Sequence, residues 1–315
     1  MPEWLIEHGI GETRALLVEN GEIVEARIMV EGAVRAGTVL EARLAQAAAP
    51  TIALADGREY LLPGGAPGVT QGAALRIEVT REAIPGVEPW KRPLARATGE
   101  PASMPPQCAG QEVAFPSPGG NALDDAGWAD VIEQASSGMV EFAGGSLNIS
   151  PTPAMTLIDV DGTLPAAELA VAGATAAAKA IRRLDIGGSV GIDLPTVAGK
   201  TLRQAAAAAI DAHLPQPFER TAVNGFGFIQ IVRPRSRASL LEIWTNHASA
   251  EARTLLRRAA LSGSGPRRLA AHPRVITILE AHPAWLDALA RQLGGVVSLR
   301  ADPALHISAG HAEPA

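Results

Sequence analysis

Residues 156–164 read TLIDVDGTL, and the interpretation of this stretch decides how the rest of the chain is understood. Apolar residues lead into Asp159, and Asp161 follows after a single valine. A short apolar run bounded by turn residues predicts a buried β-strand. The stretch therefore predicts a strand ending in a carboxylate, which in a protein serves either as a nucleophile or as a ligand of a metal ion.

The residues downstream predict alternating helices and strands. Residues 166–185 form an alanine-rich helical pattern that stops at the glycines of IGG. The apolar run SVGIDL, residues 189–194, predicts a second buried strand that carries Asp193 near its end. A second helix over residues 200–214 and one or two strands within 218–234 follow. The order strand, helix, strand, helix, strand predicts an α/β layer.

The two ends of the chain predict further parts. Closely spaced strand and turn patterns over 36–85 predict a small barrel of the OB type, which follows short strands in residues 1–35. Residues 99–121, rich in proline, glycine and serine, predict a linker, and DDAGWADVIEQAS after them predicts a helix. Residues 248–261 predict another helix, and the tail over 274–306 predicts strand, helix and strand in a small α/β domain.

Composition limits the class of protein. Apolar residues make up 47% of the 315 residues, and the net charge of −6 gives no support by itself for nucleic-acid binding. Arginines nevertheless accumulate in the second half of the chain, and the single Cys108 excludes an intramolecular disulfide. The N-terminus lacks a leader pattern, and no stretch is apolar enough for a membrane span. We therefore expect a cytoplasmic protein without membrane contacts.

Taken alone, DVDGT resembles the signature of haloacid dehalogenase-type phosphatases, in which the first aspartate is the nucleophile. That family also needs a Ser or Thr after a second strand, a lysine, and a late acidic pair for Mg²⁺. In this sequence the downstream aspartates stand singly, and about 150 residues of strand-rich sequence precede the signature. The phosphatase interpretation is therefore ranked third, after the two interpretations that follow from a longer resemblance described next.

A longer span resembles the catalytic segment of the ribonuclease E/G family. Four blocks across about residues 137–241 agree with it in order, spacing and character: SSGMVEFAGGSLNISPTPAMTLIDVDG, AAAKAIRRLDIGGSVGIDLPTV, AAIDAHL and FGFIQIVRPRSRASL. The resemblance implies ribonuclease H-like strands interrupted by an OB-type barrel, then a DNase I-like catalytic α/β segment and a small C-terminal α/β domain. The implied bounds are 1–35 and 86–143 for the ribonuclease H-like part, 36–85 for the barrel, 144–248 for the catalytic segment and 249–315 for the C-terminal domain.

The resemblance implies a Mg²⁺-dependent endoribonuclease that cleaves single-stranded RNA in RNA processing or decay, independently of the RNA 5′ end. Asp159 and Asp193 would be catalytic and would hold the Mg²⁺, with Asp161 beside them as a further ligand. Mg²⁺ prefers oxygen ligands, and one or two carboxylates plus a substrate phosphate suffice, so we expect the two carboxylates within about 6 Å. The expected RNA-binding residues are Arg233, Arg235, Arg237 and Lys91.

The sequence departs from the family pattern at several places. The family's zinc link needs paired cysteines, so no zinc is expected and any homo-oligomer would form without that link. The segment over 99–136 leaves little room for the family's 5′-monophosphate pocket, and Thr196 stands where the family has a further Asp. Tyr60 is the obvious stacking residue of the barrel, whereas single-strand binders stack bases on several aromatics. A catalytically weak or inactive RNA-binding relative is therefore the second alternative.

Overall fold

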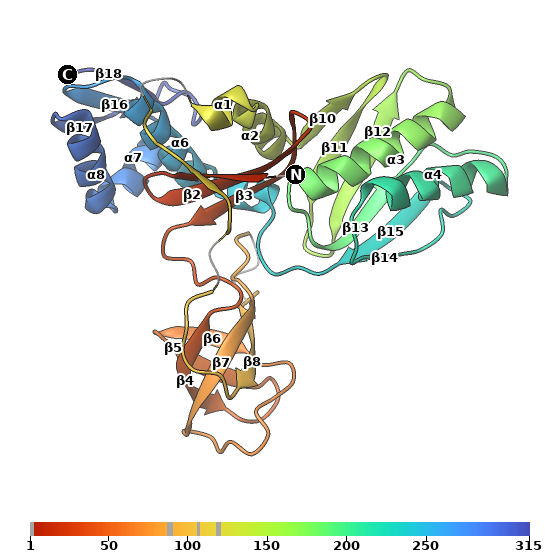
Figure 1. Cartoon of the computed structure of the whole chain (residues 1–315), viewed down its shortest axis with the longest axis horizontal. Coiled ribbons are helices and arrows are strands. Elements are labelled where there is room, and N and C mark those ends of the chain that lie inside the picture. The colour runs from red at the N-terminus through yellow and green to blue at the C-terminus, as the bar shows by residue number, and fades with distance from the viewer. Residues whose placement is uncertain (1–2, 87–90, 106–107, 118–120) are drawn as a thin grey trace. The chain divides into compact units, whose positions relative to one another are not determined.

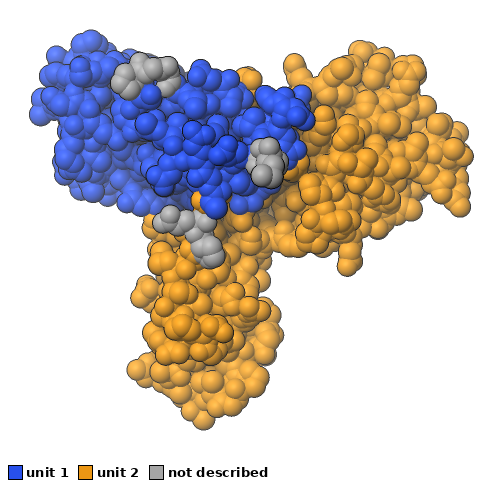
Figure 2. Space-filling model, in the orientation of Figure 1, with its two compact units in different colours: residues 1–31, 109–129, 243–315 blue, residues 32–108, 130–242 orange. Residues whose placement is uncertain are grey.

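The computed structural model describes residues 3–86, 91–105, 108–117 and 121–315 of the chain. They form a mixed α/β structure with several sheets and a closed five-stranded barrel. The chain divides into two compact units (Figure 2). Unit 1 contains residues 1–31, 109–129 and 243–315, and unit 2 contains residues 32–108 and 130–242. Each unit is therefore assembled from segments that lie far apart in the sequence. No helix within the described ranges is long and apolar enough to cross a bilayer.

Unit 1 is built on two sheets (Figure 1). The first has the order β3–β2–β1–β9, with β9 parallel to β1, and the second has the order β17–β16–β18. The strands are β1 (Glu3–His8), β2 (Glu12–Glu19), β3 (Glu22–Val30), β9 (Gln111–Val113), β16 (Arg267–Ala271), β17 (Val297–Ala301) and β18 (His311–Pro314). The helices are α1 (Ala122–Asp125), α6 (His247–Leu261), α7 (Pro273–Glu280) and α8 (Pro283–Leu293).

The C-terminal residues share a core with the N-terminal strands. Ile10, between β1 and β2, belongs to one apolar cluster with Leu255 of α6, Leu279 of α7 and Trp285 of α8. The segment expected as a C-terminal domain, residues 249–315, thus lies in the same compact unit as the first three strands.

One secondary-structure prediction in unit 1 is wrong. The run RVITILE predicts a strand from its β-branched residues, but these residues form most of helix α7. The side chain of His272 accepts a hydrogen bond from a backbone N–H of the first turn, and Pro273 occupies the first helical position, which suits its fixed φ. The buried side chains of the helix are Val275, Ile276 and Leu279. Burial of this one helical face overrides the β-propensity of the individual residues.

The barrel of unit 2 closes in the order β4–β5–β6–β8–β7. Its strands are β4 (Val39–Gln46), β5 (Ile52–Ala55), β6 (Arg58–Leu61), β7 (Ala74–Arg81) and β8 (Leu94–Thr98). A small barrel is thus confirmed, but β8 begins beyond residue 85, where the sequence predicts the barrel to end. β8 pairs with both β6 and β7, so it is the strand that closes the barrel.

The second sheet of unit 2 has six strands in the order β10–β11–β12–β13–β15–β14. The strands are β10 (Met139–Phe142), β11 (Gly145–Pro151), β12 (Thr156–Gly162), β13 (Gly188–Asp193), β14 (Glu219–Arg220) and β15 (Phe228–Arg233). The helices that follow β12 and β13 are α3 (Ala166–Arg183) and α4 (Lys200–His213), as the sequence predicts. Two more helices, α2 (Trp128–Ser137) and α5 (Leu240–Trp244), lie where the chain passes from one unit to the other.

Helix α3 packs against one face of this sheet (Figure 1). Ile158 and Val160 of β12 are buried on that face, and a Cβ atom at Gly173 of α3 would lie 2.3 Å from the Val160 side chain. Small residues of α3 therefore allow the helix to approach the sheet closely. The opposite face carries exposed side chains, including Leu157 (40% exposed) and Val232 (48% exposed). We call this second face the open face, because it presents β12, β13 and β15 to solvent.

Candidate active site

Asp159 and Asp193 lie opposite each other on neighbouring strands. β12 and β13 run parallel, and their register pairs Asp159 directly with Asp193. Neighbouring strands lie about 4.8 Å apart, and paired residues point their side chains to the same face. The predicted placement on adjacent strands is confirmed. Asp193 is the last residue of β13, whereas Asp159 lies inside β12, which continues to Gly162.

This carboxylate pair carries an uncompensated negative charge. Both side chains belong to exposed positions of their strands. Within the described part of the chain, neither the Asp159 side chain nor the Asp193 side chain has a hydrogen bond or an ion pair. Like charges directly opposite in a sheet are destabilising, by an amount comparable to the roughly 0.2–1 kcal/mol that a favourable cross-strand pair contributes. Two adjacent ionised carboxylates that have no protein cation as a partner carry two negative charges, which would balance the charge of a divalent metal ion.

Two further polar side chains extend the site along the open face. β11 is antiparallel to β12, and its register pairs Asn148 with Asp159 and Ser146 with Asp161. In the described ranges, no three His, Cys, Asp or Glu side chains are grouped closely enough to hold a metal ion. The structure therefore groups Asp159 with Asp193, while Asp161 lies one pleat further along β12. Asn148 is not among the site residues predicted from the sequence. The alternation of apolar and polar residues in LNIS, residues 147–150, is the signal that could have indicated its place on the open face.

An aromatic ring borders the carboxylate pair. The register of β13 and β15 pairs Asp193 with Phe228 and Gly191 with Gln230. A Cβ atom at Gly191 would lie 2.6 Å from the Phe228 ring and 3.0 Å from the Met155 sulfur. The Phe228 ring thus lies over the backbone of Gly191, beside Asp193 on the open face. Glycine at this position leaves the space that the ring occupies.

The three arginines predicted to bind RNA lie away from the carboxylate pair. Arg233 is at the far end of β15, paired with Gly188, and its guanidinium donates to the backbone carbonyl of Ile186 at 2.9 Å. Arg235 forms an ion pair with Glu242, and Arg237 forms one with Asp185 at 2.9 Å. The structure gives each of these side chains an intramolecular partner, and their RNA-binding role stays a prediction.

The two residues of the barrel region that were expected to contact RNA, Lys91 and Tyr60, are a hydrogen-bonded residue and a buried residue, respectively. Lys91 donates a hydrogen bond to the backbone carbonyl of Pro153 at 2.8 Å. Residues 87–90, part of the expected barrel exit, lie outside the described residues. Tyr60 is 0% exposed in the barrel core, where burial raises the pKa of its hydroxyl. A ring in that position is inaccessible to a base.

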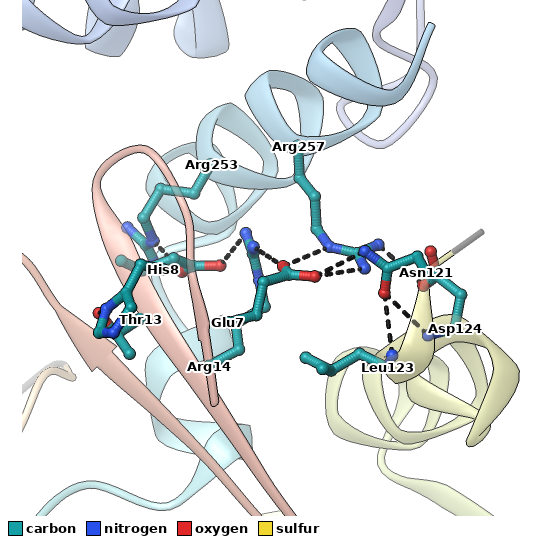
Figure 3. A network of polar contacts seen from close by, with 10 residues as sticks. Glu7, His8, Thr13, Arg14, Asn121, Leu123, Asp124, Arg253 and Arg257 are labelled. Atoms are coloured by element: carbon teal, nitrogen blue, oxygen red, sulfur yellow. Dashed lines mark hydrogen bonds and ion pairs between the residues drawn. The ribbon is translucent and has the colours of Figure 1, made fainter. Parts of the chain in front are cut away.

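A second polar cluster lies in unit 1 (Figure 3). The carboxylate of Glu7 accepts hydrogen bonds from Arg14 at 2.7 Å, from Asn121 at 2.7 Å and from Arg257 at 2.9 Å. Arg257 also donates to Asp124 at 2.8 Å. Burial by itself would raise the pKa of Glu7, but hydrogen bonds from Arg257 and Asn121 and the two cationic charges outweigh it and lower that pKa.

This cluster has the properties of a structural network. Glu7 is fully buried, and both of its oxygens have protein partners. The partners come from β2, from the segment before α1 and from α6, so the network links all three segments of unit 1. A buried and saturated carboxylate offers no site for a substrate, and its removal would take one of two carboxylate partners from each of the buried side chains of Arg14 and Arg257.

Comparisons with known proteins give no match, either to a protein-family model or to a curated protein. The chemistry of the chain therefore has to be inferred from the exposed carboxylate pair and its surroundings.

Proposed function

We propose that the chain is a Mg²⁺-dependent endoribonuclease that cleaves single-stranded RNA at the open face of the second sheet. The observation that carries this proposal is the register pairing of Asp159 with Asp193 on an exposed sheet face. The family resemblance of residues 137–241 supports RNA as the substrate. The proposal includes cleavage that does not depend on the RNA 5′ end.

The residues present fit a Mg²⁺ ion. Asp159 and Asp193 would hold it, because two carboxylates and a substrate phosphate satisfy an ion that keeps several of its waters. The ion would supply Lewis-acid stabilisation of the charge that develops on the scissile phosphate. Asn148, opposite Asp159, brings an amide that can donate a hydrogen bond to a phosphate oxygen or a bound water.

The open face suits a polymeric substrate. It is exposed along β12 and β15, so a strand of RNA can cross the carboxylate pair without threading through a closed pocket. Cleavage within a strand requires access of this kind, because the scissile bond lies between flanking nucleotides.

The test is cleavage of a labelled single-stranded RNA in Mg²⁺ and in EDTA. Asp159→Asn and Asp193→Asn should each reduce the rate by roughly 100-fold or more, since loss of one group that stabilises transition-state charge costs a few kcal/mol. Glu141→Gln is the matched control, because it removes one carboxylate from an exposed position of β10 in the same sheet. Equal rates for all four proteins would refute the assignment of the site. RNAs with a 5′-monophosphate and a 5′-hydroxyl should be cleaved at equal rates.

The second candidate is an RNA-binding relative that does not cleave. The observation that favours it is that only two carboxylates, and no third ligand, are grouped among the described residues. This candidate predicts that wild type and Asp159→Asn bind RNA equally and that neither cleaves it in Mg²⁺. The phosphatase alternative needs a third acidic ligand near Asp159, and the described residues do not supply one.

A further inference from the structure

We infer that Phe226 is a base-stacking residue that holds one nucleobase of a single-stranded RNA next to the Asp159–Asp193 pair. This inference rests on the proposed function, because it concerns the strand whose phosphate the carboxylate pair would bind. It adds a recognition contact that the carboxylates cannot make, namely with the flat face of a base.

Phe226 is unusually exposed for its residue type. It is 83% exposed, the highest value among the large apolar side chains of the described chain. Burial of a phenylalanine stabilises a protein by about 1.5–3 kcal/mol, and this residue contributes almost none of that to the fold. The side chain is therefore available to a ligand, and stacking on an aromatic ring accepts any base because every base has a π-face.

The turn that carries Phe226 is held firmly by the protein. The Asn224 side-chain oxygen accepts hydrogen bonds from the backbone N–H groups of Phe226 at 2.9 Å and of Phe228 at 3.1 Å. The hydroxyl of Thr196 donates to the Phe226 carbonyl at 2.9 Å. Gly227 has a φ of 98°, and a Cβ atom there would lie 2.1 Å from the carbonyl oxygen of Leu194. The exposed ring thus projects from an ordered backbone, so little entropy is lost when a base stacks on it.

The strand register and the Thr196 hydrogen bond place the backbone of the Phe226 turn near Asp193. Phe228 is the register partner of Asp193, and β15 runs antiparallel to β13. Phe226 precedes Phe228 by two residues, so it lies just beyond the end of β13 at which Asp193 is found. Thr196 belongs to the loop that follows Asp193, and its hydrogen bond ties that loop to the Phe226 turn. A phosphate at the pair and a base on Phe226 would then belong to neighbouring nucleotides of one strand.

The barrel residue that was expected to stack on a base is not accessible for stacking. Tyr60, the obvious aromatic of the barrel, is fully buried. Single-strand binders need aromatic faces for their bases, and the exposed Phe226 lies two residues before Phe228, the register partner of Asp193.

The experiment measures binding of a short fluorescent single-stranded RNA in EDTA, where metal-dependent cleavage does not occur. Phe226→Ala should weaken binding by roughly 5- to 150-fold, the loss that 1–3 kcal/mol of stacking corresponds to. Phe226→Trp should bind as tightly as wild type or more tightly, whereas Phe226→Leu, apolar but without a π-face, should bind like the alanine variant. Val296→Ala is the matched control, since it truncates another highly exposed apolar side chain (76% exposed) that lies in unit 1, outside the sheet of the carboxylate pair.

An abasic scan makes the test specific to stacking. RNAs with one abasic nucleotide at successive positions should include one RNA that wild type and Phe226→Ala bind with equal affinity, because the partner of the ring is missing. The inference is overturned if wild type does not bind single-stranded RNA, if Phe226→Ala binds like wild type, or if the loss is the same for every abasic RNA.

These outcomes are separable from those that test the proposed function. Phe226-dependent binding without Asp159-dependent cleavage would refute the nuclease and leave the stacking contact in place. Asp159-dependent cleavage with unchanged binding by Phe226→Ala would refute the stacking contact and leave the nuclease in place.

Discussion

Replacing Asp193 by asparagine should stabilise the metal-free sheet and abolish its response to Mg²⁺. The two carboxylates face each other across one strand spacing, about 5 Å, on an exposed surface. In a water-like dielectric, two unit charges at that distance repel by about 0.8 kcal/mol. Asp193→Asn removes this repulsion and nearly preserves the shape of the side chain. The metal-free variant should therefore be more stable locally by about 0.8 kcal/mol.

Mg²⁺ should reverse this order. A site with a Kd on the order of 1 mM, as weak oxygen-ligand sites have, gains roughly 1.4 kcal/mol at about 10 mM free ion. Wild type should gain this amount, and Asp193→Asn, with one ligand fewer, should gain little. The variant is then expected to be the more stable protein in EDTA and the less stable one in Mg²⁺.

Hydrogen–deuterium exchange of peptides that cover β12 and β13 is the appropriate assay, because it reports the local opening free energy of these strands. After correction for intrinsic rates, Asp193→Asn should exchange about fourfold more slowly than wild type in EDTA. Mg²⁺ should slow exchange of wild type about tenfold. Glu141→Gln should keep the full Mg²⁺ response. A Mg²⁺ response that is equal in wild type and Asp193→Asn would refute the metal site, and equal exchange in EDTA would refute the electrostatic reasoning.

Three other predictions concern stability and metal content. Glu7→Gln should destabilise unit 1 by roughly 1–3 kcal/mol in chemical denaturation, because the buried guanidiniums of Arg14 and Arg257 each lose one of their two carboxylate partners and keep only Glu12 and Asp124, respectively. The pKa of Glu7 is lowered from its ordinary value of 4.5, so the ionised carboxylate stabilises the folded protein above pH 4.5. This stability is lost as the pH falls through the folded-state pKa. An acid titration followed by circular dichroism should therefore show less acid sensitivity in Glu7→Gln than in wild type. Gly191→Ala should cost about 1–3 kcal/mol and displace the Phe228 ring, which a shifted aromatic resonance would reveal, whereas an unchanged spectrum would contradict the proposed packing. Elemental analysis after dialysis should show no stoichiometric zinc, and one zinc per chain would overturn that expectation.

The elements around the candidate site could be predicted because their signals are local. Three segments each have the residue pattern of a single strand or helix: the apolar run before Asp159, the alanine-rich segment after it and the apolar run that ends near Asp193. The structure contains all three elements. Side-chain periodicity and glycine stops depend on residues a few positions apart, so a sequence states them directly. The same locality explains the correct prediction of a small barrel from closely spaced strands.

Tertiary structure decided the features that depend on distant residues. RVITILE becomes helix α7 because one helical face is buried in the core that also contains Ile10 and Trp285, and this burial outweighs local β-propensity. The predicted RNA-binding residue Arg237 is paired with Asp185, and no local pattern reveals such a partner.

The candidate site itself divides in the same way. The sequence by itself predicted that Asp159 and Asp193 lie on two strands joined by a helix, an order that favours neighbouring parallel strands. Only the tertiary structure decided the register that sets them side by side, the exposure of that sheet face and the exposure of Phe226 on the turn before β15. The physical reason is that register and exposure are set by packing of the whole sheet against α3, whereas strand formation follows from the residues of each strand.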